Sequence, residues 1–433
     1  MAPPAVTSRA PSLGAMLLAL ALPPVFTHID HQPTFDVGTL TVQLADIFVI
    51  VAGVYALVAY RGDLPRLLRA RTVWLATGAL FVWILAACFY PLLWQDSYDT
   101  GEHVVSALKW FEYALLAIAP ALVLRTRRDV HLFFGVLTLW AALAALVAVA
   151  QFVGADWLEA WGAGSRQPSF VGTHDLAALG GAAMLAGLIA LVGAGEPFRS
   201  RAVAWVCLVV GAIGFILGGA TAGVVGLVLA CGALLVITRG RHVLLIGGAC
   251  VLCAVGVLAI RSKDFADFTR FVGLRERSQP RGVETYSQRT VLAYIAGRVW
   301  LDHPVVGVGW HGTDEFENLA PYVDDARRRF PDQHPQSFPA PEHPYGVQTL
   351  YAEALADLGA IGFLLLAAWF GSVVWIAWRG PPPFSLIGLT WVLLVIGLWS
   401  AEGFTSGIPL DGVTWLGVGF AVAAAARAGT VDG

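Results

Sequence analysis

The stretch Glu342–Leu365 reads EHPYGVQTLYAEALADLGAIGFLL, and it decides what kind of fold this chain adopts. It begins with a histidine beside a proline and continues as an apolar helix. Glu353 and Asp357 lie between them at i,i+4 spacing, so both carboxyl groups fall on one face of that helix. Ionisable groups inside a membrane-spanning helix face a cavity or a partner. The stretch therefore predicts a membrane helix whose outer mouth carries polar chemistry.

The composition of the whole chain agrees with a membrane protein. Of its 433 residues, 57% are hydrophobic and only 13% are charged. An ordinary soluble domain has about 25% charged residues. The remaining polar surface is too small to cover a water-soluble globule, so we predict an all-α polytopic integral membrane protein.

Apolar runs long enough to cross a bilayer, about 20 residues each, recur along the chain. We count twelve and predict twelve transmembrane helices. The runs lie near residues 11–29, 40–60, 72–94, 103–124, 130–153, 173–194, 202–218, 222–238, 242–260, 347–378, 384–402 and 410–427. Residues 1–260 would then hold helices one to nine, residues 261–346 a large extracytoplasmic loop with catalytic elements and amphipathic helices, and residues 347–433 helices ten to twelve.

Charge alternates from one predicted loop to the next. With the N-terminus taken as cytoplasmic, the inner loops hold Arg61, Arg66, Arg125, Arg127, Arg199, Arg201, Arg239, Arg241 and Arg379, and the short outer loops hold Asp30, Asp99, Glu102, Asp156 and Glu159. In the short outer loops Arg166 is the exception. This is the asymmetry of the positive-inside rule. It predicts a multi-pass protein of the inner (cytoplasmic) membrane with both termini in the cytoplasm and an active site facing outward.

The long segment 261–346 is polar, rich in proline and basic. Positive charge on the outer face runs against the insertion bias, so an anionic ligand is its simplest explanation. Within it, Val291, Ile295 and Val299 recur at helical spacing and predict an amphipathic helix on the outer leaflet. Arg289 and Arg298 on that helix can hold a phosphate through paired N–H donors. The alternative is that these arginines snorkel or form local ion pairs.

Three sequence motifs follow one another along the second half of the chain. SQR ends at Arg289, DHPVVGVGW covers residues 302–310, and EHPYGVQTLYAEALADLGAIGFLLL covers residues 342–366. This order resembles the O-antigen ligase and O-antigen polymerase superfamily of membrane glycosyltransferases. That family shows an arginine before an hP-hh-G-h-G turn, and then a histidine shortly before a helix ending in E-x-G-hh-G. SFVGTHDLAALGG, at residues 169–181, is similar to the F-x-x-P-N-x-h-A helix start of the family.

The resemblance covers the topology of the chain and motifs over residues 169–365. It implies a GT-C-like fold and the inverting, metal-independent transfer of a glycan from an undecaprenyl-diphosphate carrier, without a cofactor. The acceptor is a glycan, lipid or protein on the outer face of the membrane, the bilayer is a partner, and no nucleic acid is involved. Such a transfer requires a base for the acceptor hydroxyl, cations for the departing diphosphate and a cavity that admits the carrier.

Two residues match the catalytic positions that the resemblance implies. His343 suits the base, because an unperturbed imidazole titrates near pH ~6.5 and lies here at the mouth of a span. A capping or interfacial role is the alternative for His343. Arg289 matches the arginine that binds the diphosphate, where a fixed guanidinium stabilises the charge that grows on the leaving group.

The chain departs from the family pattern at three places. A second arginine, in S-R-G, is replaced by Ala222, which cannot bind phosphate, so Lys109, Arg166 or Arg298 would have to supply that cation. The H-N dipeptide often found at the histidine is His343-Pro344 here. The P-N of the upstream element is His174-Asp175.

Further polar and aromatic residues are candidates for binding the substrate. They are Arg298, Glu353, Asp357, Lys109, His174, Asp175, Trp310 and His311. For each of them a structural contact within the helix bundle is the alternative, and Lys109 has Glu112 one turn away. The histidines of the long loop have no spacing known for metal ligands, so no metal site is predicted.

Three other functions compete with a glycan ligase. A chain polymerase of the same superfamily differs only in its acceptor. A flippase or transporter of lipid-linked oligosaccharides would need charges spread through several spans, whereas the predicted spans are nearly free of charge. A peptidoglycan polymerase of the shape-and-division family also has many spans and a large outer loop, but its motifs are not evident.

Overall fold

The computed structural model describes residues 10–37, 40–95, 98–271, 274, 283–343, 345–404 and 408–428. Almost all of the regular structure in these residues is helical. The α-helices are α1 Leu13–Val25, α2 Leu44–Ala59, α3 Leu64–Leu67, α4 Arg71–Ala87, α5 Thr100–Glu112, α6 Leu115–Val123, α7 Arg127–Phe152, α8 Thr173–Leu191, α9 Arg201–Gly218, α10 Thr221–Ile237, α11 Val243–Ile260, α12 Ser262–Phe271, α13 Thr285–Asp302, α14 Phe316–Arg329, α15 Leu350–Arg379, α16 Phe384–Leu398 and α17 Ile408–Arg427. Short 3-10 turns are η1 Ile29–His31, η2 Arg61–Asp63, η3 Leu68–Ala70, η4 Tyr90–Leu93, η5 Gly312–Asp314, η6 Pro335–Ser337 and η7 Trp399–Ala401, and one hairpin joins β1 Thr34–Val37 to β2 Leu40–Gln43.

The described helices confirm a multi-pass, all-helical architecture. Nine helical segments in the described residues are long and apolar enough to cross a membrane. Three shorter apolar helices, α1, α2 and α10, have 13, 16 and 17 residues. Helix therefore occurs in each of the predicted apolar runs, while the number of true spans stays a prediction.

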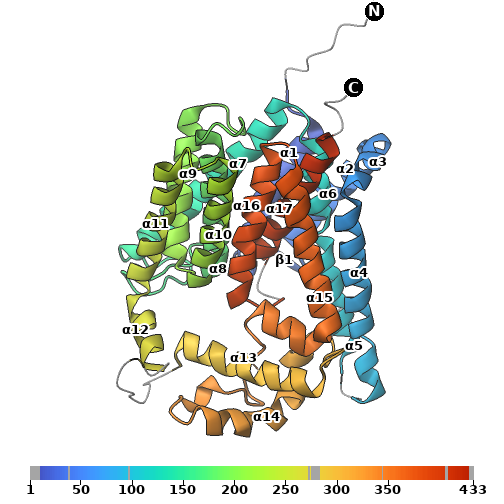
Figure 1. Cartoon of the computed structure of the whole chain (residues 1–433), viewed down its shortest axis with the longest axis vertical. Coiled ribbons are helices and arrows are strands. Elements are labelled where there is room, and N and C mark those ends of the chain that lie inside the picture. Colours follow the sequence, from blue (N-terminus) through green and yellow to red (C-terminus); the bar gives the residue numbers. More distant parts are fainter. Residues whose placement is uncertain are drawn as a thin grey trace, which may run out of the picture.

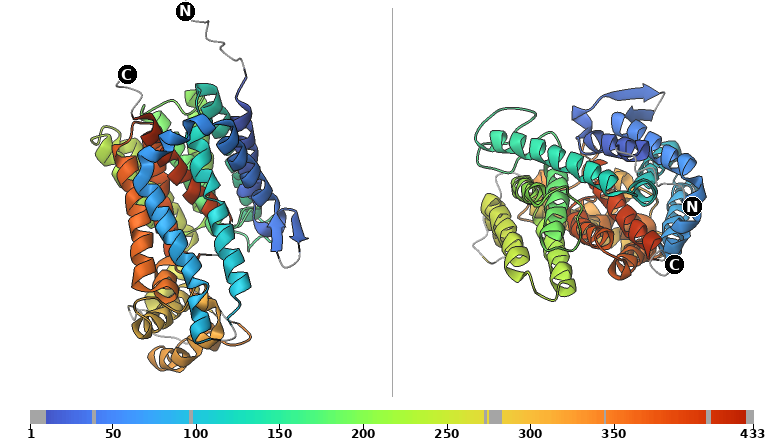
Figure 2. Two further views of the ribbon diagram at one scale, coloured as in Figure 1. Left: turned by 90° about the vertical axis from the view of Figure 1, so that its right-hand side faces the viewer. Right: turned by 90° about the horizontal axis from the view of Figure 1, so that it is seen from above.

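The bundle has two different ends (Figure 1). The start of α1 and the end of α17 lie at one end, and α12, α13 and α14 lie at the other, as the rotated view in Figure 2 also shows. The described part of the predicted long loop is thus a helical layer across one end of the bundle. The apolar face of α13 does not lie free on a lipid leaflet, because Val291, Ile295 and Val299 are fully buried in a cluster with residues of α14 and α15.

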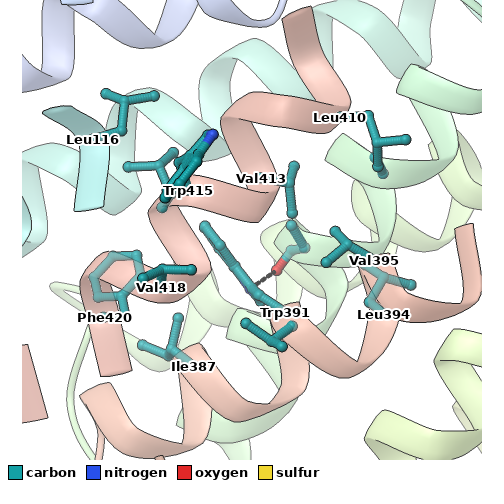
Figure 3. Close-up of a cluster of buried hydrophobic side chains, with 14 of the residues drawn as sticks. Leu116, Ile387, Trp391, Leu394, Val395, Leu410, Val413, Trp415, Val418 and Phe420 are labelled. Carbon is teal, nitrogen blue, oxygen red and sulfur yellow. Dashed lines mark hydrogen bonds between the residues drawn. The ribbon is translucent and has the colours of Figure 1, made fainter. Parts of the chain in front are cut away.

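The interior of the bundle is formed by α8, α16 and α17, in which most residues are buried. Trp391 of α16 lies among apolar side chains of α16 and α17, including Val395 and Phe420 (Figure 3). Its indole N–H donates to the carbonyl of Ala182 in α8, at 3.0 Å. A buried tryptophan needs such a partner, so this bond fixes the position of α8 against α16.

Helices α8 and α9 touch through glycine. A Cβ atom on Gly180 would lie 2.5 Å from the backbone nitrogen of Phe215, and one on Gly211 would lie 2.4 Å from that of Met184. Small residues at a helix crossing let two membrane helices approach at backbone distance. This contact places the start of α8 beside the end of α9.

Helix α15 is broken at Gly359, within the stretch that the sequence predicts as one helix. Gly359 has φ 65° and ψ −169°, a conformation essentially confined to glycine. The N–H groups of Ala360 and Ile361 donate to the carbonyls of Pro304 and Val305, at 2.9 and 3.3 Å.

The loop after α13 completes this exchange from the other side. Val308 and Gly309 donate their N–H groups to the carbonyls of Ala356 and Asp357, both at 2.9 Å. We call these four main-chain bonds the α15 interlock. A Cβ atom on Gly359 would lie 2.3 Å from the carbonyl oxygen of Val305. The interlock therefore requires a glycine at the break, and it fixes the first half of α15 against the turn that precedes His311.

Candidate functional site

A cavity of about 570 Å³ opens where the start of α8 meets α13 and the loop before α15. It is lined by Trp161, Arg166, Thr173, His174, Arg289, Asp314, Tyr345, Gly346, Val347, Gln348, Glu353, Glu402 and Gly403. These residues come from segments that are distant in the sequence. Two arginines, one histidine and three acidic residues meet there, so the cavity can bind a charged ligand.

Arg289 lies in the wall of this cavity, as the sequence predicts for a ligand-binding arginine. Its side chain is 15% exposed, and Nη2 lies 3.6 Å from Glu402 Oε1. Nε donates a long hydrogen bond to Gln348 Oε1 at 3.4 Å. Burial lowers the pKa of Arg289, Glu402 opposes this shift and the charge of Arg261 adds to it. A guanidinium nevertheless stays charged, so the site holds a partly desolvated cation.

Arg166 is the second cation of the cavity. Its guanidinium carbon lies 4.1 Å from the centre of the Trp161 ring. Burial, together with the charges of Arg261 and Arg289, lowers the pKa of Arg166 to about 10. A Cβ atom on Gly219 would lie 2.8 Å from Cβ of Arg166, so this arginine borders the turn just before Ala222. Arg166 thus lies close to the point where the S-R-G motif lacks its arginine.

The other two substitutes suggested by the sequence lie elsewhere. Lys109 Nζ is 3.2 Å from Asp46 Oδ2, and Lys109 does not line the cavity. Arg298 is 45% exposed, and its Nε is 3.8 Å from Asp325 Oδ2 on α14. Nine residues, or about two and a half helical turns, separate Arg298 from Arg289, so the two arginines point to opposite faces of α13. Of the three candidates, Arg166 is the one in the cavity.

His174 and Glu402 form a pair in the cavity wall. His174 Nδ1 contacts Glu402 Oε1, and both side chains are largely buried. Among the described residues His174 has a partner at Nδ1 alone. Its Nε2 is therefore available to a ligand, while Glu402 lies between the imidazole and Arg289.

His343 lies in an exposed part of the loop before α15. The backbone N–H of His343 donates to the carbonyl of Ala340 at 2.9 Å, and the imidazole ring stacks on the Tyr345 ring with the ring centres 6.0 Å apart. Tyr345 lines the cavity but His343 does not. Pro344, which replaces the asparagine of the family pattern, lies outside the described residues. The structure thus brings Arg289 to the cavity and places His343 in the loop next to a cavity residue.

Residues 206–367 match a family model described as O-antigen ligase. This match supports membership of the chain in the O-antigen ligase superfamily. The matched segment runs from α9 to the first turns of α15 after the break, so it includes Arg289 and both sides of the α15 interlock. No curated protein matches the chain.

The acids of α15 are bound to the backbone of neighbouring segments. Glu353 Oε2 accepts from Phe404 N at 2.8 Å, and Asp357 Oδ1 accepts from Thr313 N at 2.9 Å. Both side chains are buried, and Glu353 also borders the cavity. One oxygen of each carboxyl group therefore makes a structural contact within the bundle, which was the alternative to substrate binding for these two acids.

His311 lies beside these acids and does not line the cavity. Its Nδ1 is 3.3 Å from Glu353 Oε1 and 3.2 Å from Asp314 Oδ2. Burial opposes ionisation of the ring, but the two carboxylates outweigh it and raise the pKa of His311 to about 10.

Trp310 and Asp175, two further predicted substrate contacts, bind other parts of the protein. Trp310 is fully buried, and its indole N–H donates to Ser106 Oγ at 3.3 Å. Asp175 Oδ1 accepts from Leu410 N at 3.1 Å, in the first turn of α17. A carboxylate there satisfies a free N–H group of that helix and favours its N-terminal dipole.

From the sequence, Glu402 near the outer end of its predicted span is a candidate for pairing with an arginine or orienting sugar hydroxyls, and Arg166 is one of three candidates for the missing cation. Glu402 ends a run, 384–401, that contains no charged residue, and an acid in that position at the end of a span indicates a functional or paired group. Arg166 is the one arginine in the short loops that the sequence predicts to be outer, against the positive-inside pattern. Both signals were present, but only the folded chain shows that these two residues meet Arg289.

Proposed function

We propose that the protein transfers a glycan from a polyprenyl-diphosphate carrier to an acceptor hydroxyl at the outer face of the cytoplasmic membrane. One observation carries the proposal. Arg166 and Arg289 come from distant segments and line one cavity at the end of a membrane-type bundle. The match to the O-antigen ligase model supports the same class of reaction.

The two arginines are suited to the diphosphate leaving group. When the bond between the sugar C1 and the phosphate oxygen breaks, negative charge grows on the diphosphate. Guanidinium groups bind phosphate oxygens through two parallel N–H donors. Partial burial strengthens that interaction relative to water, so Arg289 and Arg166 can stabilise the departing charge more than the ground state.

The base in this proposal is His174. Its Nδ1 faces Glu402, which holds the ring and stabilises the imidazolium once a proton arrives. Nε2 takes the proton of the acceptor hydroxyl, the oxygen attacks the sugar C1 from the side opposite the diphosphate, and the configuration at C1 inverts. His343, the base expected from the sequence, is the alternative, because its loop also supplies Tyr345 to the cavity wall.

Transfer can be tested directly with the full-length protein in liposomes. The probe is a synthetic undecaprenyl-diphosphate oligosaccharide, supplied with a panel of lipid, glycan and peptide acceptors, and mass spectrometry identifies the products. A glycan bound to an added acceptor, with release of undecaprenyl diphosphate, is the expected result for a ligase. A ladder of longer glycans without any added acceptor indicates a polymerase instead. Movement of the intact donor across the bilayer without cleavage contradicts the proposal and indicates a transporter.

A further inference from the structure

Several buried polar atoms without a hydrogen-bond partner lie close to Glu353, which borders the cavity. Among the described residues, these atoms include both ring nitrogens of His311, Oγ1 of Thr313 and Oδ2 of Asp357. All three side chains are at least 97% buried. Buried polar groups are nearly always paired, so a cluster of such atoms indicates a ligand that they share.

The two acids of α15 each keep one oxygen free for such a ligand. Phe404 N holds Glu353 Oε2 and Thr313 N holds Asp357 Oδ1. The second oxygens are therefore oriented by bonds from the backbone: Oε1 of Glu353, which lies 3.3 Å from His311 Nδ1, and Oδ2 of Asp357, which has no hydrogen-bond partner among the described residues. Oriented carboxylates of this kind are typical of metal ligands, whose outer contacts fix the direction of the donor atom.

The donor atoms are close enough to share one ion. One donor atom from each of His311, Glu353 and Asp357 lies within 4.8 Å of the others. His311 Nδ1 is 3.3 Å from Glu353 Oε1, yet this contact does not have the geometry of a hydrogen bond. A metal ion about 2.0–2.2 Å from each donor separates neighbouring donors by about 3 Å or slightly more, so this pair is already at the required spacing.

The charges of the cluster also favour a cation. Glu353 and Asp357 are buried carboxyl groups, and Asp314 adds a third acid at 3.2 Å from the imidazole. A proton on His311 is the rival explanation. It would balance only one of the two carboxylates of α15. A divalent ion balances both acids of α15 while the imidazole stays neutral.

We propose that His311, Glu353 and Asp357 bind one divalent transition-metal ion beside the cavity. A donor set of one imidazole nitrogen and two carboxylate oxygens suits Zn²⁺ or Mn²⁺ better than Ca²⁺, which prefers six to eight oxygens. The ion would join the turn after α13 to the first half of α15, next to the α15 interlock. This inference does not depend on the proposed function, since transfer can rely on the arginines whether or not the ion is present.

Metal content of the full-length protein in detergent tests this proposal without any substrate. The protein is stripped with a chelator, incubated with one equivalent of ZnCl2 or MnCl2, passed through a desalting column and measured by plasma mass spectrometry. The variants are His311→Asn and Asp357→Asn, of which the second preserves side-chain size. Asp411→Asn is the matched control, because Asp411 is also a buried acid, bonded to Trp110 Nε1 at 3.0 Å and not to this cluster.

About one ion per chain is expected for the unmodified protein and for Asp411→Asn, and less than a tenth of that for either cluster variant. Addition of the metal should also raise the unfolding temperature of the stripped unmodified protein, and should not do so for Asp357→Asn. Two results would overturn the proposal. One is an unmodified chain that retains no ion and shows no rise in unfolding temperature; the other is cluster variants that retain as much metal as the control.

Discussion

Arg289 Nη2 lies 3.6 Å from Glu402 Oε1, so a single carboxylate stands between the proposed diphosphate cation and the proposed base. The same oxygen of Glu402 contacts His174 Nδ1. A diphosphate that binds Arg289 competes with Glu402 for the guanidinium. We infer that donor binding leaves Glu402 free to support His174, so the base gains its full partner when the donor is in place.

Removal of Arg289 should greatly reduce glycan transfer. Arg289→Ala deletes a cation aimed at the leaving group, and loss of one such donor typically lowers kcat by about 10²–10³-fold. Arg289→Lys should recover part of the rate, since it restores the charge without the two-pronged geometry. Initial rates with the lipid-linked donor provide the measurement.

Arg298→Ala is the matched control for Arg289. It removes the same side chain from the same helix, but from the opposite face, where Arg298 pairs with Asp325 at 3.8 Å. Exposed ion pairs contribute about 0–1 kcal/mol, so transfer should stay within about threefold of the unmodified rate. Equal losses for both variants would contradict the assignment of the site.

Arg166 should be the cation that replaces the missing arginine near Ala222. A hydrogen bond from a charged group is worth about 1.5–3 kcal/mol. Arg166→Ala should therefore lower kcat/KM for the donor by about 10- to 100-fold. Lys109→Ala is the comparison, because Lys109 pairs with Asp46 and lies outside the cavity wall; its kcat/KM per folded protein should be little changed. If Lys109→Ala shows the larger defect, Arg166 is not the substitute.

Replacing His174 and His343 one at a time should show which of the two histidines is the base. His174→Ala removes the proposed base, and a general base typically contributes about 10²–10⁴-fold to the rate. Glu402→Gln should produce a smaller loss of kcat, since the imidazole remains without its carboxylate. His343→Ala should retain most of the activity. The opposite result, with His343→Ala nearly inactive and His174→Ala nearly normal, would identify His343, in the loop before α15, as the base.

Two glycines of α15 should respond in opposite ways to alanine. At Gly359 a Cβ atom would collide with Val305 and the backbone would keep a conformation that costs about 1–3 kcal/mol for other residues. Gly359→Ala should therefore destabilise the protein by at least that amount. At Gly371, in the same helix, a Cβ atom meets nothing within 4 Å, and Gly371→Ala should stabilise by about 0.5–1 kcal/mol. Unfolding curves in mild detergent compare the two, and equal stabilities would argue against the strain at Gly359.

The helices could be predicted from the sequence because membrane crossing is a local property. The runs of apolar residues and the Arg-rich loops between them predict the segments that form helix, and the motif order predicts the superfamily whose model matches residues 206–367. Arg289 was predicted as a cation of the site from one motif and does line the cavity. Helical spacing alone also predicts that Arg289 and Arg298 lie on opposite faces of α13, so only one of them can face the cavity.

The contacts between distant segments could not be predicted in the same way. Glu402 reaches His174 only because α8 and α16 pack side by side, and Trp391 and Ala182 hold them there. Arg166 reaches the cavity because Gly219 leaves room for its side chain. Trp310 looked like a ligand contact beside a glycine turn, yet it is enclosed by other aromatic rings. These outcomes depend on three-dimensional packing that no single motif encodes.

The α15 interlock joins its two segments through main-chain atoms, which every amino acid shares. Side chains such as Val306 or Ala360 can therefore be exchanged for others of similar size without disturbing the four bonds, whereas the glycines of these segments have no room for a Cβ atom; they are Gly307, Gly309, Gly359 and Gly362. Mutational tolerance across residues 303–310 and 356–362 should accordingly be bimodal, permissive at positions such as Val306 and Ala360 and strict at the four glycines. A signature of this kind records stereochemistry and not catalysis, so it can survive in a protein whose sugar, acceptor and even reaction have diverged.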